Sequence, residues 1–114
     1  MPSTTATRLF VYGTLIDPAC QRTVTCRTFS SRPARLDGWR RIAPSHGYPH
    51  LVSDPTASVA GTVLDGIDPP AWRALDDYED EGNLYRRCTV EVSAGDDTLT
   101  CEVYVGHHIP PDWR

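Results

Sequence analysis

Stretches of β-branched and aromatic residues recur along the chain, separated by glycine, proline and polar residues. Four stretches have the composition of β-strands and end before turn-forming residues: 8–12, 59–64, 85–92 and 99–105. Three weaker strand candidates are residues 23–29, 35–42 and 51–52. Because residues 94–97 are typical of a turn, the last two strong stretches should form a hairpin. The pattern therefore predicts a sheet that is largely antiparallel.

Proline and glycine divide this predicted sheet. Pro33, Gly38 and Pro55 should break the chain between strands, and residues 43–49 hold two prolines and a glycine, which is typical of a loop. Gly61 lies inside a strong stretch and indicates a bulge or the close approach of another backbone.

A helix is predicted in mid-chain, where the apolar period changes from two residues to between three and four. Asp68 and Pro69 are typical of an N-cap and a first helical position. At about 100° per residue, one apolar face then carries Ala71, Trp72, Leu75 and Tyr78. Asp17 and Pro18 give the same signal and predict a second, short helix. Together these elements predict an α+β fold: a small mixed, mostly antiparallel β-barrel with one main helix.

Glu79 is unusual because it falls about 40° from Leu75 on the helical wheel, between Leu75 and Trp72. A carboxylate among core-facing side chains is costly unless it is paired or serves chemistry. Apolar surroundings should raise its pKa toward the range useful for proton transfer. The ordinary alternative is a glutamate at a frayed helix end, in water or paired with Arg86 or Arg87. The neighbouring acids are expected on the flank or in solvent: Asp76, Asp77 and Asp80.

A second candidate is the turn after the first strand, formed by Tyr12, Gly13, Thr14 and Leu15. Glycine lets the backbone turn sharply and expose successive N–H groups, which can hold a carboxylate or an oxyanion. A tight turn without a ligand is the commoner meaning of such a tetrapeptide. The turn alone is therefore weak evidence for a site.

Other reactive side chains give weaker signals. The histidines lack the spacing of metal ligands and are interpreted as surface residues: His46, His50, His107 and His108. The cysteines include no C-x-x-C pair and are interpreted as small buried thiols: Cys20, Cys26, Cys88 and Cys101. Tyrosines at strand ends and loops could line a polar pocket around Glu79: Tyr12, Tyr48, Tyr85 and Tyr104. No metal site is predicted.

Composition narrows the classes of function. The 114 residues fit one domain, spanning residues 1–114. A formal net charge of −4 gives no reason to expect nucleic acid as a partner. No apolar run has the length of a membrane span, and the N-terminus lacks the pattern of a signal peptide, so we expect a cytoplasmic protein. The oligomeric state is left open by the sequence.

Six short motifs follow one another along nearly the whole chain. They are LFVYGTL from Leu9, YPHLV from Tyr48, VAGTV from Val59, LDDYE from Leu75, YRR from Tyr85 and EVYV from Glu102. The set, which is more specific than any one motif, resembles the γ-glutamylcyclotransferase-like family. That resemblance implies a small mixed barrel with a cavity at one end.

The resemblance also implies an activity, the release of 5-oxoproline and a free amine or amino acid from a small γ-glutamyl compound. Glu79 would match the family's catalytic acid–base glutamate. The turn from Tyr12 to Leu15 would bind the γ-glutamyl group, largely through backbone amides. Tyr85 and Tyr104 would match tyrosines that line the site. No cofactor or metal is implied.

Asp80 departs from the family pattern, in which many members carry glycine, and would put a second charge beside the site. Residues 84–87 and 110–113 look closest to the branch that acts on γ-glutamylamines. Two alternatives remain open. The same pocket could serve another amide or acyl transfer, or the chain could be a non-catalytic member that binds a small metabolite or a protein partner.

Overall fold

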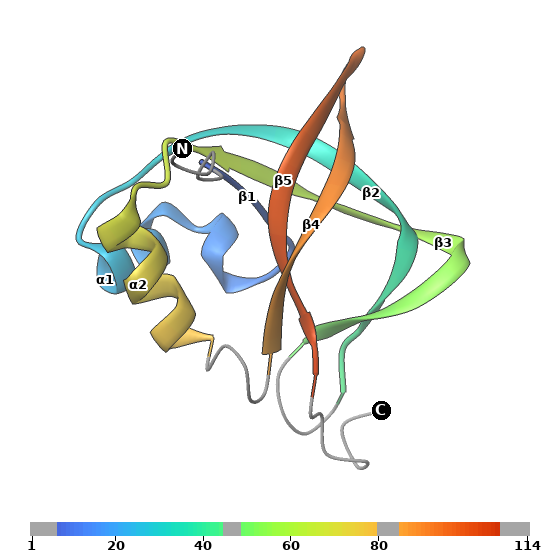
Figure 1. Cartoon of the computed structure of the whole chain (residues 1–114), viewed down its shortest axis with the longest axis horizontal. Coiled ribbons are helices and arrows are strands. Elements are labelled where there is room, and N and C mark those ends of the chain that lie inside the picture. Colours follow the sequence, from blue (N-terminus) through green and yellow to red (C-terminus); the bar gives the residue numbers. More distant parts are fainter. Residues whose placement is uncertain (1–6, 45–48, 80–84, 108–114) are drawn as a thin grey trace, which may run out of the picture.

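In the computed structural model, which describes residues 7–44, 49–79 and 85–107, five β-strands close into a barrel with two α-helices on one side (Figure 1). The order around the barrel is β1 (Arg8–Val11), β3 (His50–Asp65), β2 (Ser30–Ile42), β4 (Tyr85–Ala94) and β5 (Asp97–Gly106). Neighbouring strands are antiparallel except β1 and β5, which pair in parallel and close the barrel. The predicted mixed, mostly antiparallel barrel is confirmed.

Both helices begin at the predicted aspartate–proline signals. Helix α1 spans Pro18–Thr25 and helix α2 spans Pro69–Tyr78. The carboxylates of Asp17 and Asp68 each accept a hydrogen bond from a backbone N–H of the first turn, which is the usual N-cap geometry. Neither of these described helices is long and apolar enough to cross a membrane.

Strand β1 is covered on both faces, which explains its unbroken apolar run. Phe10 belongs to a cluster inside the barrel, together with Leu36, Val59, Val63, Val92 and Val103. Leu9 and Val11 point to the other face and pack beneath the helices, together with Leu64, Ile67, Trp72 and Leu75. Because successive side chains of a strand alternate between faces, one short strand joins the two clusters.

Gly61 shows the close backbone approach that its place in the sequence indicated. A Cβ atom there would lie 2.4 Å from the Val11 carbonyl oxygen and 2.6 Å from Cζ of Phe10. Only glycine therefore lets β3 lie this close to the end of β1, the point at which the chain leaves the barrel.

The strand predicted for residues 23–29 is wrong, because residues 18–25 form α1. Two β-branched residues favoured a strand, but their hydroxyls find acceptors inside the helix. Thr23 donates to the Ala19 carbonyl at 3.0 Å and Thr25 to the Gln21 carbonyl at 2.7 Å. Each bond joins a residue to the carbonyl four positions earlier, so the helix accommodates these side chains.

The break predicted at Pro33 is also wrong, since β2 runs through it. Strand β3 runs through Pro55 as well, but Pro55 lies between Ser53 and Ser58, where the pairing with β2 shifts register, and the Asp54 carboxylate accepts the Thr56 N–H as in a turn. Strand β2 pairs with β4 only at Arg35 and Ser93, so Pro33 lies where its missing N–H is not needed by a second neighbour. The break predicted at Gly38 is a real irregularity: its φ is +89°, and the β2–β3 register shifts there. Residues 51–52 are part of the long strand β3.

Two predicted exposures are wrong. His50, the first residue of β3, pairs with Ile42 and is 0% exposed. Cys26 is exposed and ends α1 with a positive φ of 65°. Cys101 is buried as predicted, and Cys20 and Cys88 are half-buried. His46, Tyr48 and His108 lie outside the described residues.

Candidate active site

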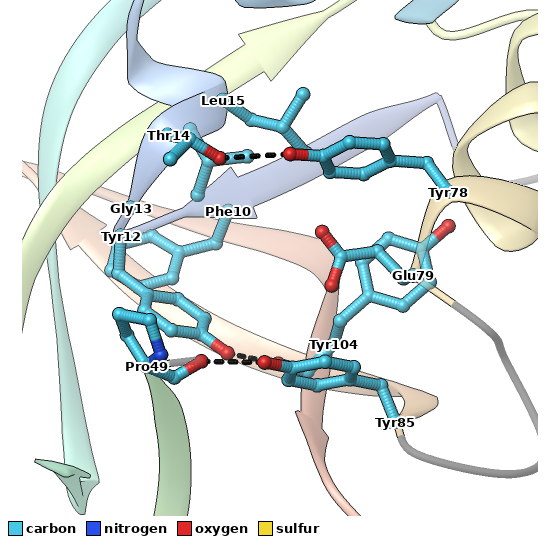
Figure 2. A pocket seen from close by; sticks show the side chains of 11 residues that line it. Phe10, Tyr12, Gly13, Thr14, Leu15, Pro49, Tyr78, Glu79, Tyr85 and Tyr104 are labelled. Atoms are coloured by element: carbon cyan, nitrogen blue, oxygen red, sulfur yellow. Dashed lines mark hydrogen bonds between the residues drawn. The ribbon is translucent and has the colours of Figure 1, made fainter. Parts of the chain in front are cut away.

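A cavity of about 350 Å³ lies at the end of the barrel where β1 ends (Figure 2). Apart from Tyr48, which lies outside the described residues, the residues that the sequence proposes for a site line it: Tyr12, Gly13, Thr14, Leu15, Glu79, Tyr85 and Tyr104. Phe10, Val11, Pro49 and Tyr78 complete the described lining. Tyr12 and Tyr104, which are 92 positions apart in the chain, therefore share one wall. Their roles stay predictions.

The turn after β1 forms a short 3₁₀ helix, η1 (Thr14–Ile16). Ile16 is the first residue whose N–H finds an acceptor within this turn, the Gly13 carbonyl at 3.1 Å. The preceding N–H groups of Thr14 and Leu15 therefore have no partner inside the turn. A Cβ atom on Gly13 would meet no heavy atom within 4 Å, so the fold leaves open space at this backbone position.

A buried glutamine, which no sequence pattern indicated, holds the turn in place through its side-chain amide. Gln21 on α1 is 2% exposed, and its Nε2 donates to the Leu15 carbonyl at 2.9 Å. Its Oε1 accepts from the Phe29 N–H at 3.2 Å. Because both ends of the amide are bonded and the Leu15 side chain is buried, the turn has a defined position beside the cavity.

Glu79 ends α2, where its backbone N–H donates to the Leu75 carbonyl at 2.9 Å. Figure 2 shows its carboxyl group pointing from the end of the helix toward the turn across the cavity. Burial raises the pKa of Glu79 to about 7, because the ionised form loses water without a compensating partner. The alternative pairing with Arg87 is wrong: that guanidinium lies 3.3 Å from Asp76 Oδ1 and 3.7 Å from Glu102 Oε1.

Tyr78 departs from the predicted apolar face, since its side chain is 48% exposed. Its hydroxyl lies 3.1 Å from Thr14 Oγ1 (Figure 2). This contact joins the end of α2 to the turn and sets the distance between Glu79 and the turn along one side of the cavity.

Three tyrosines frame the opposite side, of which Tyr85 and Tyr104 are buried and Tyr12 is half-buried. The hydroxyl of Tyr12 donates to the Tyr104 carbonyl at 2.7 Å, and that of Tyr85 donates to the Pro49 carbonyl at 2.7 Å. The Tyr104 hydroxyl donates to Asp76 Oδ1 at 2.6 Å. Burial, reinforced by nearby acidic groups, raises the pKa of both Tyr12 and Tyr104 well above the usual range for tyrosine. These phenols therefore keep their protons.

Asp76 is a further residue that the sequence did not assign to the site. It was expected on the flank or in solvent, but it is half-buried and bonded to both Tyr104 and Arg87. Asp77 is exposed, as expected.

Metal binding has no visible basis in the part of the chain that the structure describes. Within residues 7–44, 49–79 and 85–107, no three His, Cys, Asp or Glu side chains gather closely enough to hold an ion.

The chain is similar in sequence to a known protein family. Residues 9–113 match the family model described as "Gamma-glutamyl cyclotransferase, AIG2-like". The chain belongs to this family. Protein AIG2 C of Arabidopsis thaliana is 35% identical over 100 residues, which cover 85% of this chain and 59% of the relative. The chain thus spans less than two thirds of the length of the curated relatives that it matches.

Solved structures in the same family share the fold. The solution structure of At5g39720.1 from Arabidopsis thaliana has a TM-score of 0.83 and 29% identity, and covers 99% of this chain and 77% of that chain. The crystal structure of an AIG2-like protein from Mus musculus has a TM-score of 0.76 and 25% identity, and covers 96% of this chain and 83% of that chain. The family resemblance read from the motifs is therefore confirmed. Asp80, where this chain departs from the family pattern, lies outside the described residues, as do residues 110–113.

Proposed function

We propose that this member of the gamma-glutamyl cyclotransferase, AIG2-like family releases 5-oxoproline and a free amine or amino acid from a γ-glutamyl compound. The observation that carries the proposal is Glu79, whose carboxyl faces the cavity and has its pKa raised to about 7 by burial. A group with a pKa near the working pH can both accept and return a proton during one turnover. The family description, which names this activity, supports the same assignment.

The reaction needs no nucleophile from the protein. Ionised Glu79 takes a proton from the α-ammonium group, and the freed nitrogen attacks the γ-carbonyl carbon to close a five-membered ring. The bond from that carbon to the leaving nitrogen then breaks as Glu79 returns the proton to it. The attacking nitrogen releases a second proton to solvent as the ring amide forms, and the departed amine takes up one proton from solvent, so two protons are lost by one nitrogen and gained by the other and no water or cofactor is consumed.

Positioning supplies much of the rate, because the attack is intramolecular and needs the chain to be held folded on itself. None of the described lining residues is Lys, Arg or His, so no side-chain cation in this set could hold the α-carboxylate or the oxyanion. We assign that task to the backbone N–H groups of the turn from Tyr12 to Leu15. One such donor contributes about 3 kcal/mol to the transition state. The rings of Tyr85 and Tyr104 would bound the γ-glutamyl chain.

The test is a screen of γ-glutamyl dipeptides and γ-glutamylamines, with 5-oxoproline measured chromatographically. Glu79→Gln keeps the shape of the side chain but cannot take up a proton, so the rate should fall by about 10²–10⁴-fold. Glu91→Gln makes the same change at an exposed position on β4 and should act at the wild-type rate.

A Glu79→Gln variant that stays within a few-fold of wild type would remove Glu79 from the mechanism. Release of the amine without 5-oxoproline would point to another acyl transfer in the same pocket. Binding of γ-glutamyl compounds without turnover would instead make the chain a non-catalytic member of the family.

A further inference from the structure

Tyr104 makes two hydrogen bonds. One joins its carbonyl oxygen to Tyr12 in the cavity wall, and the other joins its hydroxyl to Asp76, which lies outside the wall. Its carbonyl accepts the Tyr12 hydroxyl at 2.7 Å, which ties the β5 backbone to the end of β1. Its own hydroxyl donates to Asp76 Oδ1 at 2.6 Å, which ties the tip of the ring to α2. Asp76 is not one of the residues that line the cavity. The orientation of this wall residue is therefore set by a residue behind it.

Asp76 is itself held by a half-buried ion pair. Its Oδ1 lies 3.3 Å from Nη1 of Arg87, whose guanidinium group sits 4.4 Å above the ring centroid of Trp72. Arg87 and Tyr104 face each other directly across the β4–β5 pair. The side chains of Asp76 and Arg87 are 31% and 27% exposed, so solvent screens this pair less than an ordinary surface pair. The carboxylate therefore has a fixed place against the β4–β5 hairpin.

The same carboxylate also determines where Glu79 lies. Asp76 lies in the last turn of α2 and Glu79, three residues later, is the C-cap of that helix, so their side chains are neighbours at the helix end. Because α2 ends at Tyr78, the last helical turn before Glu79 is joined to the hairpin by the Asp76–Tyr104 bond. Loss of that bond frees both the Tyr104 ring and the end of the helix that presents Glu79.

We propose that Asp76 is a positioning residue of the site: its bond to Tyr104 holds the ring in the cavity wall and keeps Glu79 beside that ring and away from bulk water. The inference rests on the proposed role of Glu79, and it concerns how the fold shields the Glu79 carboxyl group from solvent. Asp76 itself takes no part in proton transfer.

The other groups around Glu79 must be considered in any test that follows its titration. Those facing it are tyrosines of four elements, the end of β1, α2, β4 and β5: Tyr12, Tyr78, Tyr85 and Tyr104. Among the described residues, the charged groups next to this wall are Asp76, Arg87 and Glu102 on one side and Arg41, which acts on Tyr12, on the other. Removal of Asp76 therefore changes both a charge and a hydrogen bond, and the test must separate the two.

The test follows the Glu79 carboxyl by NMR titration, a readout that needs no turnover. The sequence holds only four glutamates, so Glu79→Gln identifies its signal. Asp76→Ala removes charge and acceptor together, Asp76→Asn removes the charge but keeps an acceptor oxygen, and Tyr104→Phe removes only the hydroxyl. Asp77→Asn, on the exposed face of the same helix, is the matched control.

Admission of water beside Glu79 favours its ionised form, so the titration midpoint should move to lower pH. We expect a shift of about one pH unit, a tenfold loss of proton affinity, in Asp76→Ala and in Tyr104→Phe. The double variant should shift no further than Asp76→Ala alone, because Asp76→Ala already removes both the charge and the bond that Tyr104→Phe breaks. Asp76→Asn should shift less than Asp76→Ala, and Asp77→Asn should match wild type.

An unchanged midpoint in Tyr104→Phe would overturn the proposal, as would equal shifts in Asp76→Asn and Asp76→Ala, since the effect would then be charge alone. Additive shifts in the double variant would also overturn it. If Asp76→Ala does not fold, Tyr104→Phe and Asp76→Asn still decide. If wild type does not form 5-oxoproline, the proposed function is rejected. The titration would still test whether Asp76 positions Tyr104 and Glu79, because it needs no turnover.

Discussion

Ionisation of Glu79 should cost the folded protein stability as the pH rises, and Glu79→Gln should remove that cost. Burial raises the pKa of Glu79 from 4.5 to about 7. At about 1.4 kcal/mol per pH unit, this difference amounts to about 3 kcal/mol in the free energy of unfolding. Since domains of this size are stable by only about 5–15 kcal/mol, the effect is large enough to measure.

The direction follows from which state binds the proton more tightly. The folded state does, because its pKa for Glu79 is the higher one, so protonation favours folding. Below pH 4.5 both states hold the proton and this stabilisation is complete. As the pH rises toward 7 the unfolded chain releases its proton first and the stabilisation falls. Above about pH 7 the folded state is ionised as well, and the loss is complete.

Urea unfolding of wild type and Glu79→Gln at a series of pH values from 4 to 8.5 measures this effect. The free energy of unfolding of Glu79→Gln, minus that of wild type, should grow by about 3 kcal/mol between pH 4.5 and 8. The same subtraction for Glu91→Gln, an exposed glutamate on β4, controls for the loss of one acid elsewhere. A difference for Glu79→Gln that stays flat across this range would mean that Glu79 is not held away from water, and the argument for its role as a base would fall with it.

Two further predictions concern the frame around the site. Gly61→Ala should lower the free energy of unfolding by about 3 kcal/mol in urea melts, because its Cβ would overlap the Val11 carbonyl, whereas Gly13→Ala, with open space around it, should change stability by under about 1 kcal/mol. Among the thiols, exposed Cys26 should react first with a disulfide reagent at pH 8, and Cys101, buried and with its pKa raised to about 11 by that burial, should react last; mass-spectrometric mapping of labelled sites would contradict this if Cys101 led.

The parts of the fold that could be predicted from the sequence are those fixed by neighbours in the chain. The aspartates at 17 and 68 cap their own helices, so each helix start is encoded within four residues. The β4–β5 hairpin needs only its alternating strands and the turn around Gly95. Gly61 could be marked as a close approach, although the strand that approaches it could not be named from sequence.

The predictions that are wrong concern features that are not determined by the nearest residues in the chain. Thr23 and Thr25 favour strands on their own, and the helix is decided by the cap that precedes them. Pro33 is tolerated in β2 because of how little of β4 lies alongside, which is a property of the closed barrel. Neither the outcome at Thr23 and Thr25 nor the short pairing of β2 with β4 can be recognised from the residues next to them in the sequence.

At the end of α2, some features are determined by neighbours in the chain and others by residues that are distant in sequence. The helical wheel predicts Glu79 between Leu75 and Trp72, and it treats the two flanks of that face as equivalent. On one flank, about 40° beyond Trp72, Asp76 meets Tyr104, which lies 28 residues away in sequence; on the other, Tyr78 meets Thr14, 64 residues away. These two distant partners hold the helix end from both sides, so they determine where the Glu79 carboxyl sits in the cavity. An acid at the edge of the core could be predicted from the periodicity of α2, but the position of its half-buried carboxyl group required the closed barrel.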